Sequence, residues 1–307
     1  MKESPGILGG LTPVRLIMNV AKSISEDDVF GRAAQLAYYF FLALFPLLLF
    51  LLSVLGLVAG PDSHLRENLM SMLARFAPSD AGQLISRTVN ETFKASGGFK
   101  AVVGLLGALW AASAGMGALI GTLNIAFKTK ETRPGWKQRA IALGLTVGVS
   151  VLIVLSLGLL LLGNTTANYF ASAGVVGEGV KWAWMVAQWP IVFALMLVAF
   201  GLVYYFAPNV EHPKWHWVTP GAVAGLVLWL GASFALRFYL KFFNNYSATY
   251  GSLAAVILVL LWFYLTGASL LIGGEVNSEI EHAAAAHKNV PSLQKPAQAR
   301  PHNHQFR

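Results

Sequence analysis

Six long stretches without Asp, Glu, Lys or Arg constrain this chain more than any other feature of its sequence. Crossing about 30 Å of hydrocarbon takes about 20 helical residues, and each stretch is longer than that. Lipid offers no partner for exposed backbone groups, so such segments must cross as helices. The stretches cover residues 33–61, 101–127, 140–177, 182–210, 215–236 and 242–274.

We therefore predict an all-α integral membrane bundle of six transmembrane helices, forming one domain over residues 1–282. Only 12% of the residues are charged, against about 25% in a typical soluble domain. Residues 283–307 lack periodicity and are predicted to be a disordered cytoplasmic tail. The expected spans are about 33–59, 101–127, 140–163, 184–207, 218–242 and 251–275.

The basic residues predict the orientation. They precede the first stretch, follow the last and crowd the link at 128–139, whereas the short links at 164–181 and 244–249 share one lysine. The positive-inside rule then places both termini in the cytoplasm. No cleavable signal is expected, because the first apolar segment begins only at Ala33 and is too long.

Amphipathic segments flank the first span. Val14, Ile17, Ala21 and Ile24 recur at helical spacing, which predicts an N-terminal helix that lies on the membrane interface or packs on the bundle. Ser25, followed by three acidic residues, resembles the start of the next helix. Residues 62–98 predict two short amphipathic helices on the outer side.

Pro46 interrupts the first span. It cannot donate to the carbonyl of Leu42, so a bend with a partly freed carbonyl is expected. The bend either serves packing or shapes a substrate cavity.

A cationic stripe is expected on the fifth span. Arg237 and Lys241 lie four residues apart, one turn after Ser233, and ionisable residues inside a span are costly. They either extend to the outer headgroups or, with Ser233 and Pro46, bind an anionic substrate.

A second polar group is expected at the inner surface, either as a structural lock or as an inner gate. We expect Glu275 to pair with Arg32. The group combines residues from the ends of the first, second and last spans: Arg32, Gln35, Asn124, Glu275 and Asn277.

Two GxxxG pairs, Gly117/Gly121 and Gly221/Gly225, favour close helix packing, either within one chain or in a homo-oligomer. Catalytic and cofactor motifs are not found. Cysteine is absent, and every aspartate and histidine lies outside the expected spans, so we expect no enzyme, metal or cofactor. The basic link is explained by orientation and anionic lipid, so no nucleic acid is expected as a partner.

Four segments resemble the YihY, or virulence factor BrkB, family of bacterial membrane proteins. They are "GRAAQLAYYFFLALFPLLLF" (31–50), "LNIAFKTKETRPGWKQRA" (123–140), "YYFAPNV" (204–210) and "ATYGSLAAVILVLLWFYLTGASLLIGGEVNSEI" (248–280). The resemblance implies a six-helix protein of the bacterial inner membrane. Members were once labelled a ribonuclease, an assignment regarded as mistaken, and others are connected with serum resistance or envelope lipid export.

These features together predict a membrane protein that binds or moves an amphipathic anionic molecule, a lipid or lipid-linked envelope precursor. The alternative is a non-transporting scaffold for envelope biogenesis machinery, whose small-residue faces make the contacts with its partners.

Overall fold

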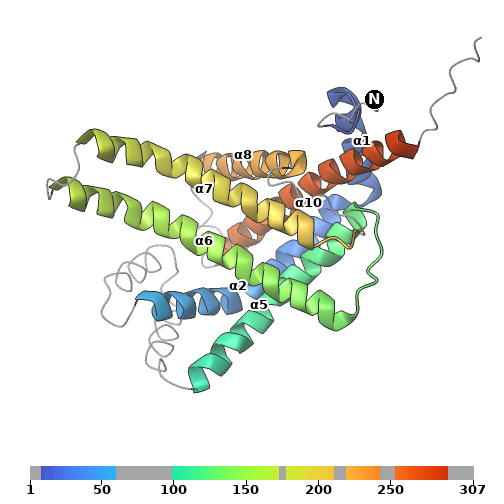
Figure 1. Cartoon of the computed structure of the whole chain (residues 1–307). Coiled ribbons are helices and arrows are strands. Elements are labelled where there is room, and N and C mark those ends of the chain that lie inside the picture. The colour runs from blue at the N-terminus through green and yellow to red at the C-terminus, as the bar shows by residue number, and fades with distance from the viewer. Residues whose placement is uncertain (1–7, 60–98, 173–177, 211–218, 243–252, 290–307) are drawn as a thin grey trace, which may run out of the picture.

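The computed structural model describes residues 8–59, 99–172, 178–210, 219–242 and 253–289, and helix is the regular structure found in these ranges. The all-α prediction is confirmed (Figure 1). The helices are α1 Pro13–Glu26, α2 Val29–Ala59, α5 Phe99–Ala126, α6 Gly135–Ser172, α7 Glu178–Phe206, α8 Pro220–Phe242 and α10 Leu253–Asn289.

Five of these helices contain segments that are long and apolar enough to cross a membrane: Leu106–Ala126, Gly135–Leu160, Lys181–Phe206, Pro220–Phe242 and Val256–Ala286. Within α2, Val29–Leu44 forms a shorter apolar segment. The number of six crossings therefore stays a prediction. The two outer amphipathic helices expected at 62–98 lie outside the described residues.

The N-terminal amphipathic helix is present as α1. Thr12 precedes it and accepts a hydrogen bond from the amide of Arg15, a typical N-cap arrangement. The expected helix start at Ser25 is wrong, because α1 continues to Glu26 and α2 begins at Val29. Asp28 caps α2 instead, since its Oδ1 accepts from the amide of Gly31 and its carbonyl accepts from the amide of Arg32.

α2 is bent as expected, whereas α10 is longer than expected. α2 continues through Pro46 and changes direction along its length in Figure 1, which agrees with the expected bend. α10 continues to Asn289, beyond residue 283, where the tail was expected to begin. The helical part of this tail begins with four alanines at 283–286, and alanine is the strongest helix former.

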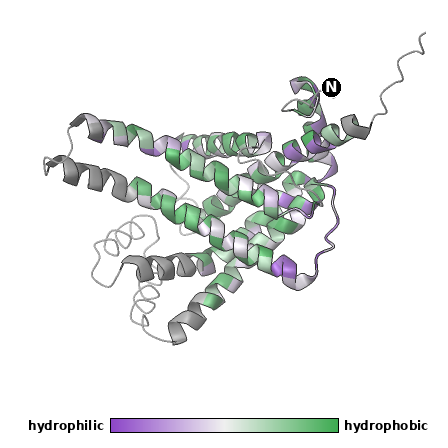
Figure 2. Ribbon diagram, in the orientation of Figure 1, coloured by the Kyte–Doolittle hydropathy of each residue, from purple (hydrophilic) through white to green (hydrophobic). Residues whose placement is uncertain are grey.

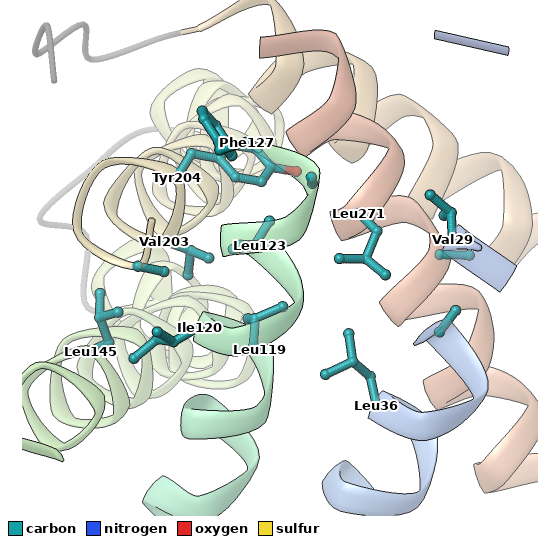
Figure 3. Packing of buried hydrophobic residues seen from close by; sticks show 14 of the residues in the cluster. Val29, Leu36, Leu119, Ile120, Leu123, Phe127, Leu145, Val203, Tyr204 and Leu271 are labelled. Carbon is teal, nitrogen blue, oxygen red and sulfur yellow. The ribbon is translucent and has the colours of Figure 1, made fainter. Parts of the chain in front are cut away.

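The hydrophobic core combines residues of α2, α5, α6, α7 and α10, with Ala222 of α8 (Figure 3). Its fully buried members include Leu36 of α2, Ile120 and Leu123 of α5, and Leu271 of α10. Tyr204 of α7 joins the same cluster, and its hydroxyl donates to the carbonyl of Leu270 at 2.8 Å. In α8, by contrast, the buried residues lie only in the first two turns.

Candidate functional site

Polar side chains gather at one end of the bundle, which we call the polar end. It comprises the turn between α1 and α2, the link between α5 and α6, the end of α7, the start of α8 and the last third of α10. Figure 2 shows hydrophilic residues concentrated near α1, the α5–α6 link and the later part of α10. The candidate site lies at the polar end, because segments distant in the sequence are hydrogen-bonded to one another there.

Asn124, at the end of α5, connects two links. Its amide Nδ2 donates to Glu131 Oε2 at 2.8 Å, and its Oδ1 accepts from the backbone amide of Asn209 at 2.7 Å. Asn209 in turn donates from Nδ2 to the carbonyl of Lys130 and to Thr132 Oγ1. The buried Asn124 side chain therefore fixes the α5–α6 link against the segment that follows α7.

Arg133 completes this cluster. Its guanidinium binds Glu131 with both Nε and Nη2 at 2.7 Å, the bidentate geometry that makes Arg–carboxylate pairs strong. It also donates to the carbonyls of Phe206 and Ala207 at the end of α7, where helical carbonyls lack intrahelical donors. We call Asn124, Glu131, Arg133 and Asn209 the link cluster.

The link cluster predicts an acid dependence of stability. Hydrogen bonding by Arg133 lowers the pKa of Glu131 from its ordinary 4.5 to about 2. A lowered folded-state pKa contributes stability that is fully present above pH 4.5 and is lost as the pH falls toward 2. The Glu131→Gln variant should be less stable than the parent protein at neutral pH. It should also lose less stability than the parent as the pH falls from 4.5 toward 2. Both are measured by thermal unfolding in detergent.

The control is a variant of Glu26, whose ion pair with Lys22 at 3.4 Å is exposed. Exposed pairs contribute little, so Glu26→Gln should keep the acid profile of the parent protein. If the parent and Glu131→Gln lost stability identically with pH, Glu131 would not be the cause of the acid dependence.

Asn277 of α10 holds the start of α8. Its Oδ1 accepts from the backbone amide of Gly221 at 2.8 Å, and its Nδ2 donates to Thr219 Oγ1 at 3.0 Å. Thr219 Oγ1 also accepts from the amide of Ala222. Asn277 thus satisfies a free amide in the first turn of α8 from a neighbouring helix.

Glu279 fastens α1 to α10. It accepts from Ser23 Oγ at 2.9 Å and from Asn19 Nδ2 at 3.2 Å, both on α1. Lys128 Nζ, from the α5–α6 link, lies 3.3 Å from Glu279 Oε1. Three segments of the chain therefore meet at one carboxylate.

The expected pair between Glu275 and Arg32 is wrong. Glu275 is fully buried, and neither of its carboxylate oxygens has a hydrogen-bond partner within the described part of the chain. Arg32 Nε donates instead to the backbone carbonyl of Asp27 at 2.6 Å. The guanidinium thus remains on the turn that precedes its own helix.

The five residues expected to form one inner group are divided among separate contacts. Asn124 belongs to the link cluster, Asn277 holds α8, and Glu275 lies beside Asp27. Arg32 stays on its own turn, and Gln35 is exposed. A lock or gate function for these residues stays a prediction.

The cationic stripe on α8 lies toward the opposite end. Arg237 and Lys241 are exposed, and Ser233 is half-buried. Phe234, Phe238 and Phe242 are about two-thirds exposed, and the rings of Phe238 and Phe242 are 4.5 Å apart. At about 100° per residue, these two cations and three phenylalanines occupy an arc of about 140° on one helix face. Pro46 is half-buried on α2.

The two GxxxG pairs differ in their surroundings. Gly221 and Gly225 are buried against α10 of the same chain, and a Cβ on Gly225 would lie 3.1 Å from the carbonyl oxygen of Ser269. A Cβ on Gly117 or Gly121 would meet no described atom within 4 Å. Close packing within the chain therefore uses the α8 pair, and homo-oligomerisation stays a prediction.

Most of the link cluster was not expected from the sequence. Arg133 counted only among the basic residues of the link, and neither Glu131 nor Asn209 was expected to bind it. One signal was available: both short polar links, "KTKETRPG" and "APNV", follow spans that end on the same predicted side. Neither link, however, indicates which partner its side chains bind.

The long apolar helices and the polar residues confined to their ends define a multi-pass helical membrane protein. A family model described as virulence factor BrkB matches residues 20–298. The chain belongs to this family, as the four sequence segments implied.

The chain is similar to a ribonuclease-like protein and to UPF0761 membrane proteins. The ribonuclease-like protein YfkH of Bacillus subtilis (strain 168) is 31% identical over 81% of this chain and 88% of its own length. UPF0761 membrane proteins of Psychrobacter sp. (strain PRwf-1) and Xanthomonas campestris pv. campestris (strain B100) are 27% and 26% identical over 82% and 83% of this chain. The chain spans only 46% and 58% of those two relatives. No solved structure matches it significantly.

Proposed function

We propose that this protein binds an amphipathic anionic molecule, a lipid or lipid-linked envelope precursor, on the exposed face of α8, and moves it across the membrane. The observation that carries the proposal is the face itself. It places a guanidinium and an ammonium beside exposed aromatic rings on one helix. The cations can form charge-assisted hydrogen bonds with a phosphate or carboxylate headgroup, and the aromatic rings can pack against acyl chains.

The position of this face supports a lipid rather than a soluble anion. Arg237 and Lys241 lie in the last two turns of the apolar helix Pro220–Phe242, after a run without other charges. Long cationic side chains near the end of a spanning helix reach the headgroup region. An anion bound there would have its apolar part next to Phe234 and Phe238.

The proposed location is the bacterial inner membrane, with the polar end in the cytoplasm. Three basic residues lie in the link between α5 and α6, and two more lie in the first two turns of α6, which is the distribution that the positive-inside rule associates with the cytoplasm. The exposed residues Val14, Ile17 and Met18 of α1 would then lie in the inner interface, with Arg15 and Lys22 near anionic headgroups.

Replacing both Arg237 and Lys241 by glutamine tests the binding step. Each cation near an anionic lipid surface contributes about 1 kcal/mol, so the double variant should bind phosphatidylglycerol about thirtyfold more weakly. Binding is measured with a fluorescent phosphatidylglycerol added to the purified protein in zwitterionic nanodiscs. The matched control is Lys130→Gln with Lys137→Gln, which removes two exposed charges at the polar end and should leave this affinity unchanged.

A second measurement separates transport from a scaffold. The parent protein is placed in vesicles with fluorescent phosphatidylglycerol, and dithionite reports lipid that reaches the outer leaflet. Binding without movement would support a non-transporting scaffold. Equal affinity in both double variants would overturn the α8 face as the binding site.

The proposal contains no catalytic step. A ribonuclease needs paired groups that move protons to and from RNA. In the basic link, Glu131 is held by Arg133 and Asn124, and its lowered pKa makes it a weak base. The acids Asp27 and Glu275 lie together, but Glu275 is fully buried and out of contact with a nucleic acid.

A further inference from the structure

Two glutamates one turn apart on α10 have opposite surroundings. Glu279 receives hydrogen bonds from Ser23 and Asn19 and an ion pair from Lys128. Glu275 is fully buried, and neither carboxylate oxygen accepts a hydrogen bond from a donor among the described residues. The first is stabilised as an anion, whereas an ionised Glu275 would be a buried charge without compensation.

A second carboxyl group lies beside Glu275. Asp27, in the turn between α1 and α2, lies one helical turn after Ser23, whose hydroxyl donates to Glu279, and Glu275 lies one turn before Glu279. The two carboxyl groups therefore lie beside each other, and Oδ2 of Asp27 is buried without a hydrogen-bond donor in the described ranges. Two ionised carboxylates have no hydrogen to share. Two carboxylates at one buried site repel each other, and one proton held between them removes that repulsion and supplies the hydrogen of a hydrogen bond.

The surrounding charges do not replace that proton. Lys128, from the α5–α6 link, faces the pair but is bound to Glu279, the other acid of α10 at this place. Arg32 of α2 directs Nε to the backbone carbonyl of Asp27. Neither cation is bound to the carboxylate oxygens of Glu275.

We propose that Asp27 and Glu275 form a proton-binding site, in which one proton held between the two carboxyl groups keeps α1 and its turn docked on α10. Loss of the proton leaves two anions facing each other in a buried contact. The turn that carries Asp27 then separates from α10, and α1 loosens with it. This site functions as a proton site whether or not the chain transports a lipid.

The absence of cysteine from the chain allows α1 docking to be measured with one introduced thiol. Val20 is buried on α1, whereas the polar residue Ser25 on the same helix is exposed. Val20→Cys and Ser25→Cys are made separately in the full-length protein in lipid nanodiscs. Maleimide labelling rates are measured from about pH 5 to about pH 9, a range in which buried carboxyl groups titrate. The ratio of the Val20→Cys rate to the Ser25→Cys rate removes the ordinary pH dependence of the thiol.

This ratio should rise with pH by up to about tenfold per pH unit, the limit for release of one proton. Glu275→Gln and Asp27→Asn remove the repulsion while keeping the side-chain shape, so in either background the ratio should stay low at every pH. Glu26→Gln, in the exposed pair with Lys22, should retain the pH dependence of the parent.

Three results would overturn the proposal. The first is a ratio that does not change with pH in the parent protein, and the second is a pH dependence that survives in both neutral variants. The third is a ratio set by added sodium or magnesium at constant pH, which would make the ligand a metal cation instead of a proton.

Discussion

Gly221→Ala should lower the free energy of unfolding by about 3 kcal/mol, because α8 and α10 touch there through their backbones. A Cβ at this position would overlap the carbonyl oxygen of Gly273 and lie 2.5 Å from Asn277 Oδ1. The overlapped atom belongs to a helix backbone and cannot rotate away, so the two helices must separate. Overpacking a well-packed contact typically costs about 1–3 kcal/mol and occasionally more, and the Asn277 contact with the start of α8 is weakened as well.

Gly231 on the same helix is the matched control. A Cβ there would meet no described atom within 4 Å. Gly231→Ala should therefore raise stability slightly, by roughly 0.5–1 kcal/mol, because alanine restricts the unfolded chain. Stability is compared by SDS titration of the proteins in mixed micelles. A loss of similar size in both variants would show that α8 and α10 do not make this backbone contact.

Arg133→Met should lower the free energy of unfolding by about 3 kcal/mol, because it breaks the ion pair that holds the link cluster together. The methionine leaves Glu131 charged with only Asn124 as a side-chain donor, and it removes the donors to Phe206 and Ala207. Removing one partner of a largely buried ion pair costs about 3–5 kcal/mol. The lower limit is appropriate because the Glu131 side chain remains 23% exposed.

Two further variants make this result specific. Lys137→Met removes an exposed charge two residues into α6 and should change stability by less than about 0.5 kcal/mol. Arg133→Lys keeps the charge but not the planar fork and should recover only part of the loss. Full recovery by lysine would mean that charge alone, without the bidentate geometry, holds the link cluster. The same SDS titration provides the measurement.

At the polar end, the location of the polar residues was predicted from the sequence, but their pairing was not. Asn124, Glu275 and Asn277 were expected near one surface because they lie at the ends of spans, and the structure places them at the polar end. The pairing was wrong for Glu275, since opposite charge alone suggested Arg32 as its partner. Arg32 has a nearer acceptor, the carbonyl of Asp27, within its own turn. Arg32 therefore binds an acceptor that is close to it in the chain and not the acid of a distant helix.

The helices, the amphipathic α1 and the clustering of polar residues at the span ends could all be predicted from the order of the residues alone. Charged residues are too costly in lipid to lie anywhere else without compensation. Three contacts could be recognised only once the helices were packed: Gly221 and Gly225 face α10, Arg133 binds Glu131, and Glu275 lies beside Asp27. A spanning helix is apolar on nearly every side, so its periodicity does not show which face packs. The rotation of each helix, and the path of each link, are set by contacts between segments far apart in the chain.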